Sequence, residues 1–141
     1  MIRLMIFISI LAILVGCGRR RADPAEVALM QTLNSIYRNQ IEQLLVQVTP
    51  ESRATLVRAA GLDKNVEPNQ AAKRIVSRLG WQFERPVVGR ARVVDGAGSD
   101  EKRIVEMEFG GKKMRFPVLR LGHRWHVDLV KAEIVTARVT N

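Results

Sequence analysis

The stretch R103-IVEMEFGGKKMRFP-V118 decides the fold, because it predicts a β-hairpin whose register can be counted. Gly110 and Gly111 supply the two-residue loop. Counting outward gives two apolar cross-strand pairs on one face and two opposite-charge pairs on the other. These pairs are Val105–Phe116, Met107–Met114, Glu106–Arg115 and Glu108–Lys113. A slip of one residue would mix the apolar and charged sets, so we expect this register.

A second turn, Gly122-His123, predicts that the sheet continues with another strand. It pairs the following residues across the turn: Arg120–Trp125, Leu119–His126, Val118–Val127 and Phe116–Leu129. We expect the Arg120 guanidinium to lie over the Trp125 indole, and the strand to run on through Val135. Alternation places His126 and Asp128 on the outward, charged face. With the earlier stretch PVVGRARVVDG as a strand, the sequence predicts a four-stranded antiparallel meander.

The chain before residue 80 follows the helical period. Asp23-Pro24 begins a predicted helix over 24–48, with Glu26 completing a capping box. Thr49-Pro50 begins a second helix that ends at Gly61, and a third runs over 68–79. The third helix is expected to bury Ala72, Ile75, Val76 and Leu79. The fold class is therefore α+β: three N-terminal helices packed on the meander in a cone-like arrangement, as a single domain over residues 23–141.

The first sixteen residues, MIRLMIFISILAILVG, have the layout of a secretory signal. Arg3 provides a basic start, and Leu4–Val15 is an apolar run of twelve residues. A spanning helix needs about 20 apolar residues. Residues 1–16 are therefore interpreted as a signal peptide that is removed.

The four residues Leu14, Val15, Gly16 and Cys17 resemble the lipobox of bacterial lipoproteins. The resemblance implies that the Cys17 thiol receives a diacylglyceryl group and that a peptidase cleaves between Gly16 and Cys17. It places the protein on the cell membrane or the outer membrane, with its domain facing the periplasm or the extracellular side. The alternative is a buried cysteine at the end of a short anchor helix.

The formal charge of +9, or +8 after loss of Arg3, favours anionic partners. Residues 17–22 form a basic tether, in which Arg19, Arg20 and Arg21 are expected to contact anionic lipid or an envelope polymer. The alternative is a solvated tether without a specific partner. A nucleic-acid partner is not expected, because only 5% of residues are aromatic and the basic residues are dispersed. A single cysteine excludes an intramolecular disulfide.

The order of helices and hairpins, together with the strand HRWHVDLV, resembles the nuclear transport factor 2-like superfamily, which includes SnoaL-like proteins. The motif G-x-x-W-x-V-[DN] of small lipoproteins of this type is met by Gly122, Trp125, Val127 and Asp128. The resemblance implies a pocket between helix and sheet, which enzymatic members line with an inward Asp or His. We expect no metal site, because His123 lies in a turn, His126 is its only near partner and no third ligand is apparent. No cofactor is expected either.

The leading hypothesis is a membrane-anchored envelope lipoprotein that acts as a non-catalytic binding or scaffold module. Its ligand would be a small apolar molecule or an envelope component, and its protein partners are unknown. The alternative is a lipid-tethered SnoaL-like enzyme that uses an acid–base pair such as His126 and Asp128. A filled apolar interior would favour the scaffold module, whereas a buried Asp128 or His126 that lines a pocket would contradict it and favour the enzyme.

Overall fold

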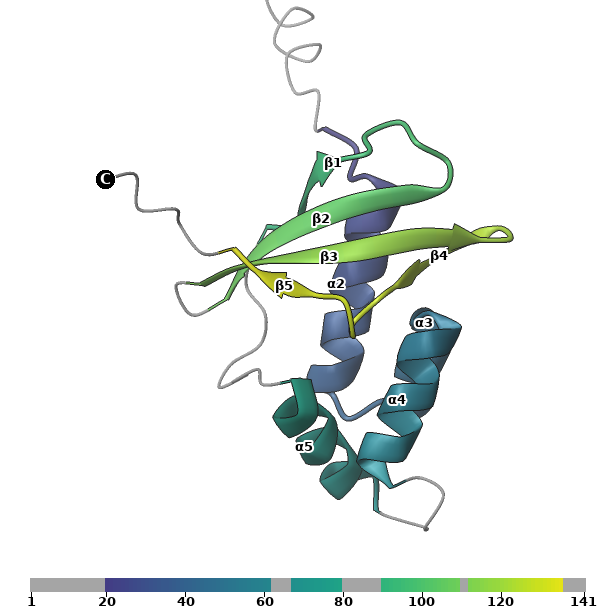
Figure 1. Cartoon of the computed structure of the whole chain (residues 1–141), viewed down its shortest axis with the longest axis vertical. Helices are drawn as coiled ribbons and strands as arrows, with labels where there is room; N and C mark the ends of the chain where they lie inside the picture. The colour runs from purple at the N-terminus through teal and green to yellow at the C-terminus, as the bar shows by residue number, and fades with distance from the viewer. Residues whose placement is uncertain (1–19, 62–66, 80–89, 110–111, 136–141) are drawn as a thin grey trace, which may run out of the picture.

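The computed structural model describes residues 20–61, 67–79, 90–109 and 112–135, and it has an α+β architecture (Figure 1). The helices are α2 (Pro24–Tyr37), α3 (Ile41–Gln47), α4 (Pro50–Ala60) and α5 (Pro68–Leu79). The strands are β1 (Arg92–Asp95), β2 (Lys102–Phe109), β3 (Lys112–Leu121), β4 (Arg124–Val127) and β5 (Glu133–Ile134). The signal peptide, the lipobox and the Gly110-Gly111 loop lie outside the described residues.

The sheet has the predicted order and register. β1, β2, β3 and β4 are neighbours in sequence order, and all pairs are antiparallel. The four β2–β3 pairs counted from the loop are confirmed, as are the three β3–β4 pairs from Arg120–Trp125 to Val118–Val127. The hydrophobic alternation and the turn spacing therefore fix this part of the fold.

The last strand is interrupted, and the prediction of one strand running through Val135 is wrong. β4 ends at Val127, the chain turns over residues 128–131, and β5 then pairs with the other end of β3. Leu129 therefore does not pair with Phe116 across the strands. It lies after the end of β4, and its side chain is 1% exposed in the core. The turn is held by Asp128, whose contacts are described below.

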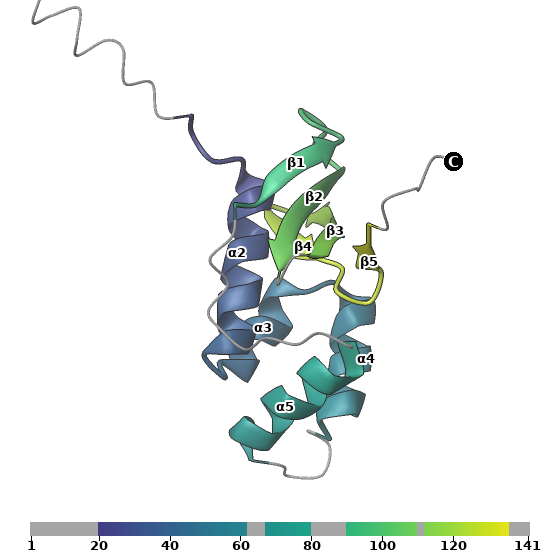
Figure 2. The same cartoon turned by 90° about the vertical axis from the view of Figure 1, so that its left-hand side faces the viewer.

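The predicted helix over 24–48 is two helices. α2 ends at Tyr37, and Asn39 adopts a left-handed backbone with φ of 57° before α3 begins at Ile41. Asparagine tolerates this conformation better than most residues. The turn folds α3 back beside α2 (Figure 2), which lets both helices bury apolar side chains in one core. The other two helices lie over the predicted ranges.

The core lies between the inner sheet face and the helices. α2 crosses the strands, whereas α4 and α5 pack on each other at the end of the molecule away from β1 (Figure 2). Leu33 and Phe116 are fully buried where α2 meets the sheet, and Leu56 and Ile75 are fully buried between the later helices. Of the expected α5 core residues, Ile75 is confirmed; the side chains of Ala72, Val76 and Leu79 lie outside the described residues.

One buried cation interrupts the otherwise apolar inner face. Arg103 shares that face with Val105 and is only 8% exposed. Its Nη1 donates to Asp23 Oδ1 at 2.6 Å, its Nε donates to the Ser99 carbonyl at 2.9 Å, and its guanidinium lies 4.5 Å from the Trp125 ring centroid. These contacts, which we name the Arg103 clamp, join the start of α2 to β2 and β4.

The Arg103 clamp corrects the expected Arg120–Trp125 contact. Arg120 instead pairs with Asp100 at 3.3 Å, near solvent. Arg103 lies on β2 and Trp125 on β4, so the guanidinium reaches the indole across the inner face of β3, which separates the two strands. The predicted capping box is confirmed: Asp23 accepts from Ala25 N, and Glu26 Oε2 accepts from Asp23 N. Glu26 Oε1 also accepts from Val93 N at 3.0 Å, which ties α2 to β1.

Replacing Asp23 by Asn tests the Arg103 clamp, because Asn keeps the helix cap but removes the charge. We expect Asp23→Asn to lower the free energy of unfolding by about 1–3 kcal/mol, since Arg103 is largely buried and loses a charged acceptor. Urea denaturation measures this. The matched control is Asp100→Asn, which removes an exposed pair and should cost less than about 0.5 kcal/mol. Equal costs would contradict the clamp.

Candidate functional site

An open groove of about 540 Å³ lies where α2, α3 and β4 meet. Each element contributes one wall. Its lining residues are Pro24, Ala28 and Gln31 from α2, Glu42, Gln43, Val46 and Gln47 from α3, and Arg124, Trp125 and His126 from β4. We refer to this feature as the groove, and it is the candidate functional site.

Helical spacing places the groove residues on two facing helix surfaces. Pro24, Ala28 and Gln31 recur at intervals of four and three residues, which puts them on one side of α2. On α3, Val46 lies one turn after Glu42, and its side chain is 54% exposed. An apolar side chain that exposed, next to a half-buried tryptophan, gives the groove an apolar surface for a ligand.

The polar groups of the groove are mostly uncharged. Gln31, Gln43 and Gln47 bring three amides, and the one carboxylate, Glu42, is matched by the one guanidinium, Arg124. Gln47 Oε1 already accepts from Ser35 Oγ at 2.9 Å, so its NH₂ group remains available to donate. The described lining residues therefore offer donors and acceptors with no formal net charge, in a chain of net charge +9.

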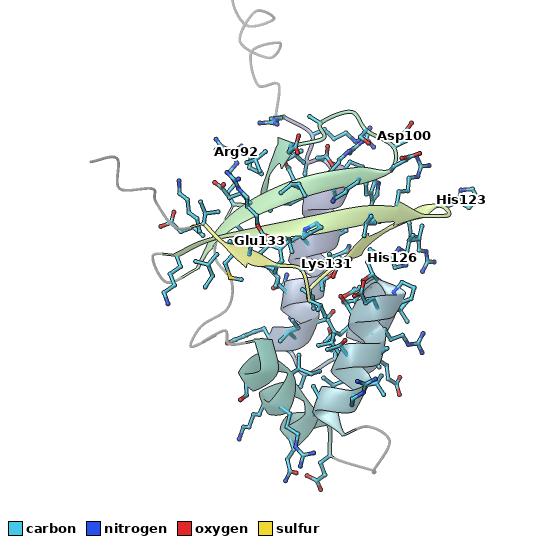
Figure 3. All side chains as sticks on the ribbon, viewed as in Figure 1. Arg92, Asp100, His123, His126, Lys131 and Glu133 are labelled. Atoms are coloured by element: carbon cyan, nitrogen blue, oxygen red, sulfur yellow. The ribbon has the colours of Figure 1, made fainter. Side chains whose placement is uncertain are left out.

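The two histidines do not converge. His126 is half-buried on β4, where it lines the groove, and its Nδ1 lies 3.1 Å from the Arg124 carbonyl. His123 lies exposed at the tip of the β3–β4 turn and projects away from the sheet (Figure 3). Among the described residues there is no group of three His, Cys, Asp or Glu side chains arranged to hold a metal ion.

Asp128 is buried, and its expected place on the outward face is wrong. The residue is 2% exposed; its Oδ1 accepts from Ser52 Oγ at 3.0 Å and from Lys131 N at 3.2 Å. Ser52 Oγ in turn accepts from Val130 N at 3.3 Å. The strand alternation used for the prediction ends at Val127, so it did not apply to Asp128. The expected His126–Asp128 pair on one face is therefore absent, and Asp128 is not among the groove residues.

Lys131 covers the Asp128 turn from the solvent side. Its Nζ lies 3.1 Å from Glu51 Oε2 and 3.6 Å from Asp128 Oδ2. The hydrogen bond and charge of Glu51, followed by the charge of Asp128, raise the pKa of Lys131 above its ordinary value of 10.5. Because the folded pKa is raised, the stabilisation by this cation is complete below pH 10.5 and is lost as the pH rises through the folded pKa.

Sequence reasoning missed the groove because the groove depends on the turn at Asn39. A continuous helix over 24–48 would not bring Val46 and Gln47 back beside Ala28. The signal available in the sequence is small: an Asn-Gln pair within the apolar period, followed by residues rich in glutamine.

A second hollow, of about 520 Å³, lies between α4 and α5 and is lined by Ala59, Lys73, Arg74 and Ser77.

Removing the Asp128 side chain tests whether this residue is structural. Asp128→Ala leaves Ser52 Oγ and Lys131 N without their acceptor in a buried place, so we expect unfolding free energy to fall by about 2–3 kcal/mol. The groove residues should keep their chemical shifts. Glu108→Ala, at an exposed strand position, is the control and should change stability by less than about 0.5 kcal/mol. A stable Asp128→Ala protein would contradict this role.

The residues proposed for anchoring mostly precede the described part of the chain. Leu14, Val15, Gly16, Cys17 and Arg19 lie outside it, whereas Arg20 and Arg21 are exposed just before α2. From residue 20 to residue 135, no described helix has the length and apolar character required to cross a membrane.

Comparison of the chain with known protein families, with curated proteins and with solved structures finds no match.

Proposed function

We propose that this protein is a membrane-anchored lipoprotein of the cell envelope and acts as a non-catalytic binding module through the groove. The observation that carries the binding role is the groove itself. It combines an exposed Val46, a half-buried Trp125 and three amides in a hollow large enough for a small ligand or a short segment of chain.

The anchor is proposed from the lipobox that ends at Cys17. A thiolate is the nucleophile required for lipid transfer, and each acyl CH₂ group buried in the bilayer contributes about 0.8 kcal/mol. Arg19, Arg20 and Arg21 would then lie beside the headgroups, where each charge adds about 1 kcal/mol on an anionic surface. The domain would face the periplasm or the extracellular side of the cell membrane or the outer membrane.

The proposed relationship to nuclear transport factor 2-like proteins, including their cone-like packing, is supported by helices that cover one face of an antiparallel sheet. Leu29, Leu33 and Phe116 are fully buried between α2 and the sheet. Ligand binding is therefore assigned to the groove at the margin of this interface. The alternative of an apolar ligand held deep between helix and sheet would require these side chains to move.

A binding role is favoured over SnoaL-like catalysis because the proposed acid–base pair is divided. The half-buried His126 lines the groove, which by itself counts toward the enzyme, but its proposed partner Asp128 lies outside the groove lining and holds the start of α4 through Ser52. General acid–base catalysis needs both groups within reach of one substrate. Among the described residues that line the groove, Glu42 is the one carboxylate, and its side chain is exposed at the surface of α3.

Palmitate labelling tests the anchor. Cells that express the wild-type chain should incorporate radioactive palmitate into it, and Cys17→Ala should remove the label because the acceptor thiol is lost. The variant should also keep its signal peptide and migrate as the larger precursor. Equal label in both proteins, or label in neither, would contradict lipidation at Cys17.

Photocrosslinking in cells tests the groove for a ligand of any chemical class. We expect benzoylphenylalanine at Gln43, which is exposed in the groove, to give adducts under ultraviolet light. The same group at Glu108, exposed on the outer face of the sheet, is the control. Adding Val46→Lys should reduce the Gln43 adduct about tenfold. Equal adducts at the two positions would contradict a binding groove.

A further inference from the structure

We propose that the groove binds an extended peptide segment, which adds to the edge of β4 that no described strand occupies at Trp125 and pairs with the main chain of that residue. This inference rests on the proposed binding function, and it names the class of ligand that the same groove takes. It follows from the direction of the β4 hydrogen bonds, from the segment that already lies on this edge and from the neutral lining.

The hydrogen-bond pattern gives Trp125 an outward-facing main chain. Main-chain groups in an antiparallel strand point alternately toward and away from a given neighbour. Asp128 N donates to the Pro117 carbonyl of β3 at 2.8 Å, so even-numbered positions face β3. The Val127 carbonyl points the other way and accepts from Thr49 N at 3.1 Å. Trp125 lies two residues earlier, so its N–H and C=O point to the same side as those of Val127.

A short extended segment of the same chain already pairs with this edge of β4, at Val127. Val48 forms a parallel bridge with Val127, and Thr49 donates the hydrogen bond given above. Trp125 is the next residue toward the start of β4 whose main-chain groups point outward, and it borders the groove. Unpaired main-chain groups at a strand edge are a template for another extended chain. A peptide in the groove would continue the pairing that Val48 and Thr49 begin.

The walls of the groove match the needs of an extended peptide. Its main chain presents one donor and one acceptor per residue, and only half of these would face β4. Gln31, Gln43 and the free NH₂ group of Gln47 can pair with the remainder. Side chains of an extended peptide alternate in direction, so one in two would meet the apolar surface formed by Ala28, Val46 and Trp125.

The charge of the groove selects against an anionic polymer. Glu42 and Arg124 compensate each other, whereas the cations Lys73 and Arg74 lie by the separate hollow on α5. A peptide main chain is neutral and fits a neutral lining. A glycan is also neutral, but it lacks an N–H and C=O pair spaced to match the Trp125 main chain. It therefore serves as the competing ligand in the test.

Nuclear magnetic resonance of the mature, lipidated chain in detergent micelles tests the inference. The chain has two tryptophans, Trp81 and Trp125, so ¹⁵N-tryptophan labelling gives two main-chain amide signals, which Trp81→Phe assigns. The probe is the capped pentapeptide acetyl-Thr-Val-Thr-Val-Thr-amide. We expect it to shift the Trp125 amide signal and to slow its hydrogen exchange at least fivefold. Methylation of the central peptide nitrogen should weaken binding about tenfold, because a main-chain donor is lost.

Two exposed valines provide a matched pair of variants. Val46→Lys should weaken binding about tenfold, whereas Val27→Lys, which is 40% exposed on α2 outside the groove lining, should leave it unchanged. Gln43→Ala removes one amide from the groove lining without adding a charge, and it should weaken peptide binding about threefold. Both lysine variants should keep the Trp125 signal position of the free protein, which verifies their fold.

Other outcomes overturn the inference. If cellotriose shifts the Trp125 amide signal with the same dependence on Val46 and the peptide does not, the peptide assignment is wrong and the binding function stands. If the peptide shifts the signal equally in both lysine variants, or the N-methylated peptide binds equally well, pairing at this edge is wrong. The crosslinking at Gln43 reports on the binding function separately, because it gives adducts with any class of ligand.

Discussion

The Arg103 clamp is the contact on which the arrangement of the domain depends. One guanidinium bonds the N-cap of α2 through Asp23, the β1–β2 turn through the Ser99 carbonyl, and β4 through the face of Trp125. A largely buried cation is favourable only when several partners replace its lost hydration. Arg103 has such partners, and two of them adjoin the groove: Asp23 precedes Pro24, and Trp125 is part of the lining. Stability and the shape of the groove therefore share one contact.

β4 is a short edge strand that is fixed at both ends. At its start, Trp125 packs under Arg103. At its end, the Val127 carbonyl accepts from Thr49 N, and the Asp128 carboxylate bonds Ser52 on α4. A four-residue edge strand held only by one neighbour would fray readily, since terminal segments with few buried contacts open at low free-energy cost. Fixing both ends keeps the edge between them open toward the groove, as a preorganised site requires.

The sequence predicted the elements whose cause is local. The β2–β3 register follows from alternation around a two-residue loop, and the starts of α2 and α4 follow from Asp23-Pro24 and Thr49-Pro50. It failed where the cause is tertiary. A 3.6-residue period does not reveal a left-handed residue at Asn39, and strand parity cannot locate the end of β4. The α3 wall of the groove arises from the first of these features and the burial of Asp128 from the second, so the sequence pattern predicted neither of them.

The position of the groove limits what it can bind if Cys17 carries lipid, as proposed. Only six residues, 18–23, lie between Cys17 and Pro24, which lines the groove, so seven Cα–Cα steps join the two. An extended chain spans at most about 3.5 Å per residue, so Pro24 would lie within about 25 Å of the membrane surface. The Arg103 clamp fixes the start of α2 to the sheet, so the groove cannot move away from this tether by unwinding the helix without loss of stability. A partner of the groove must therefore present its segment close to the same membrane.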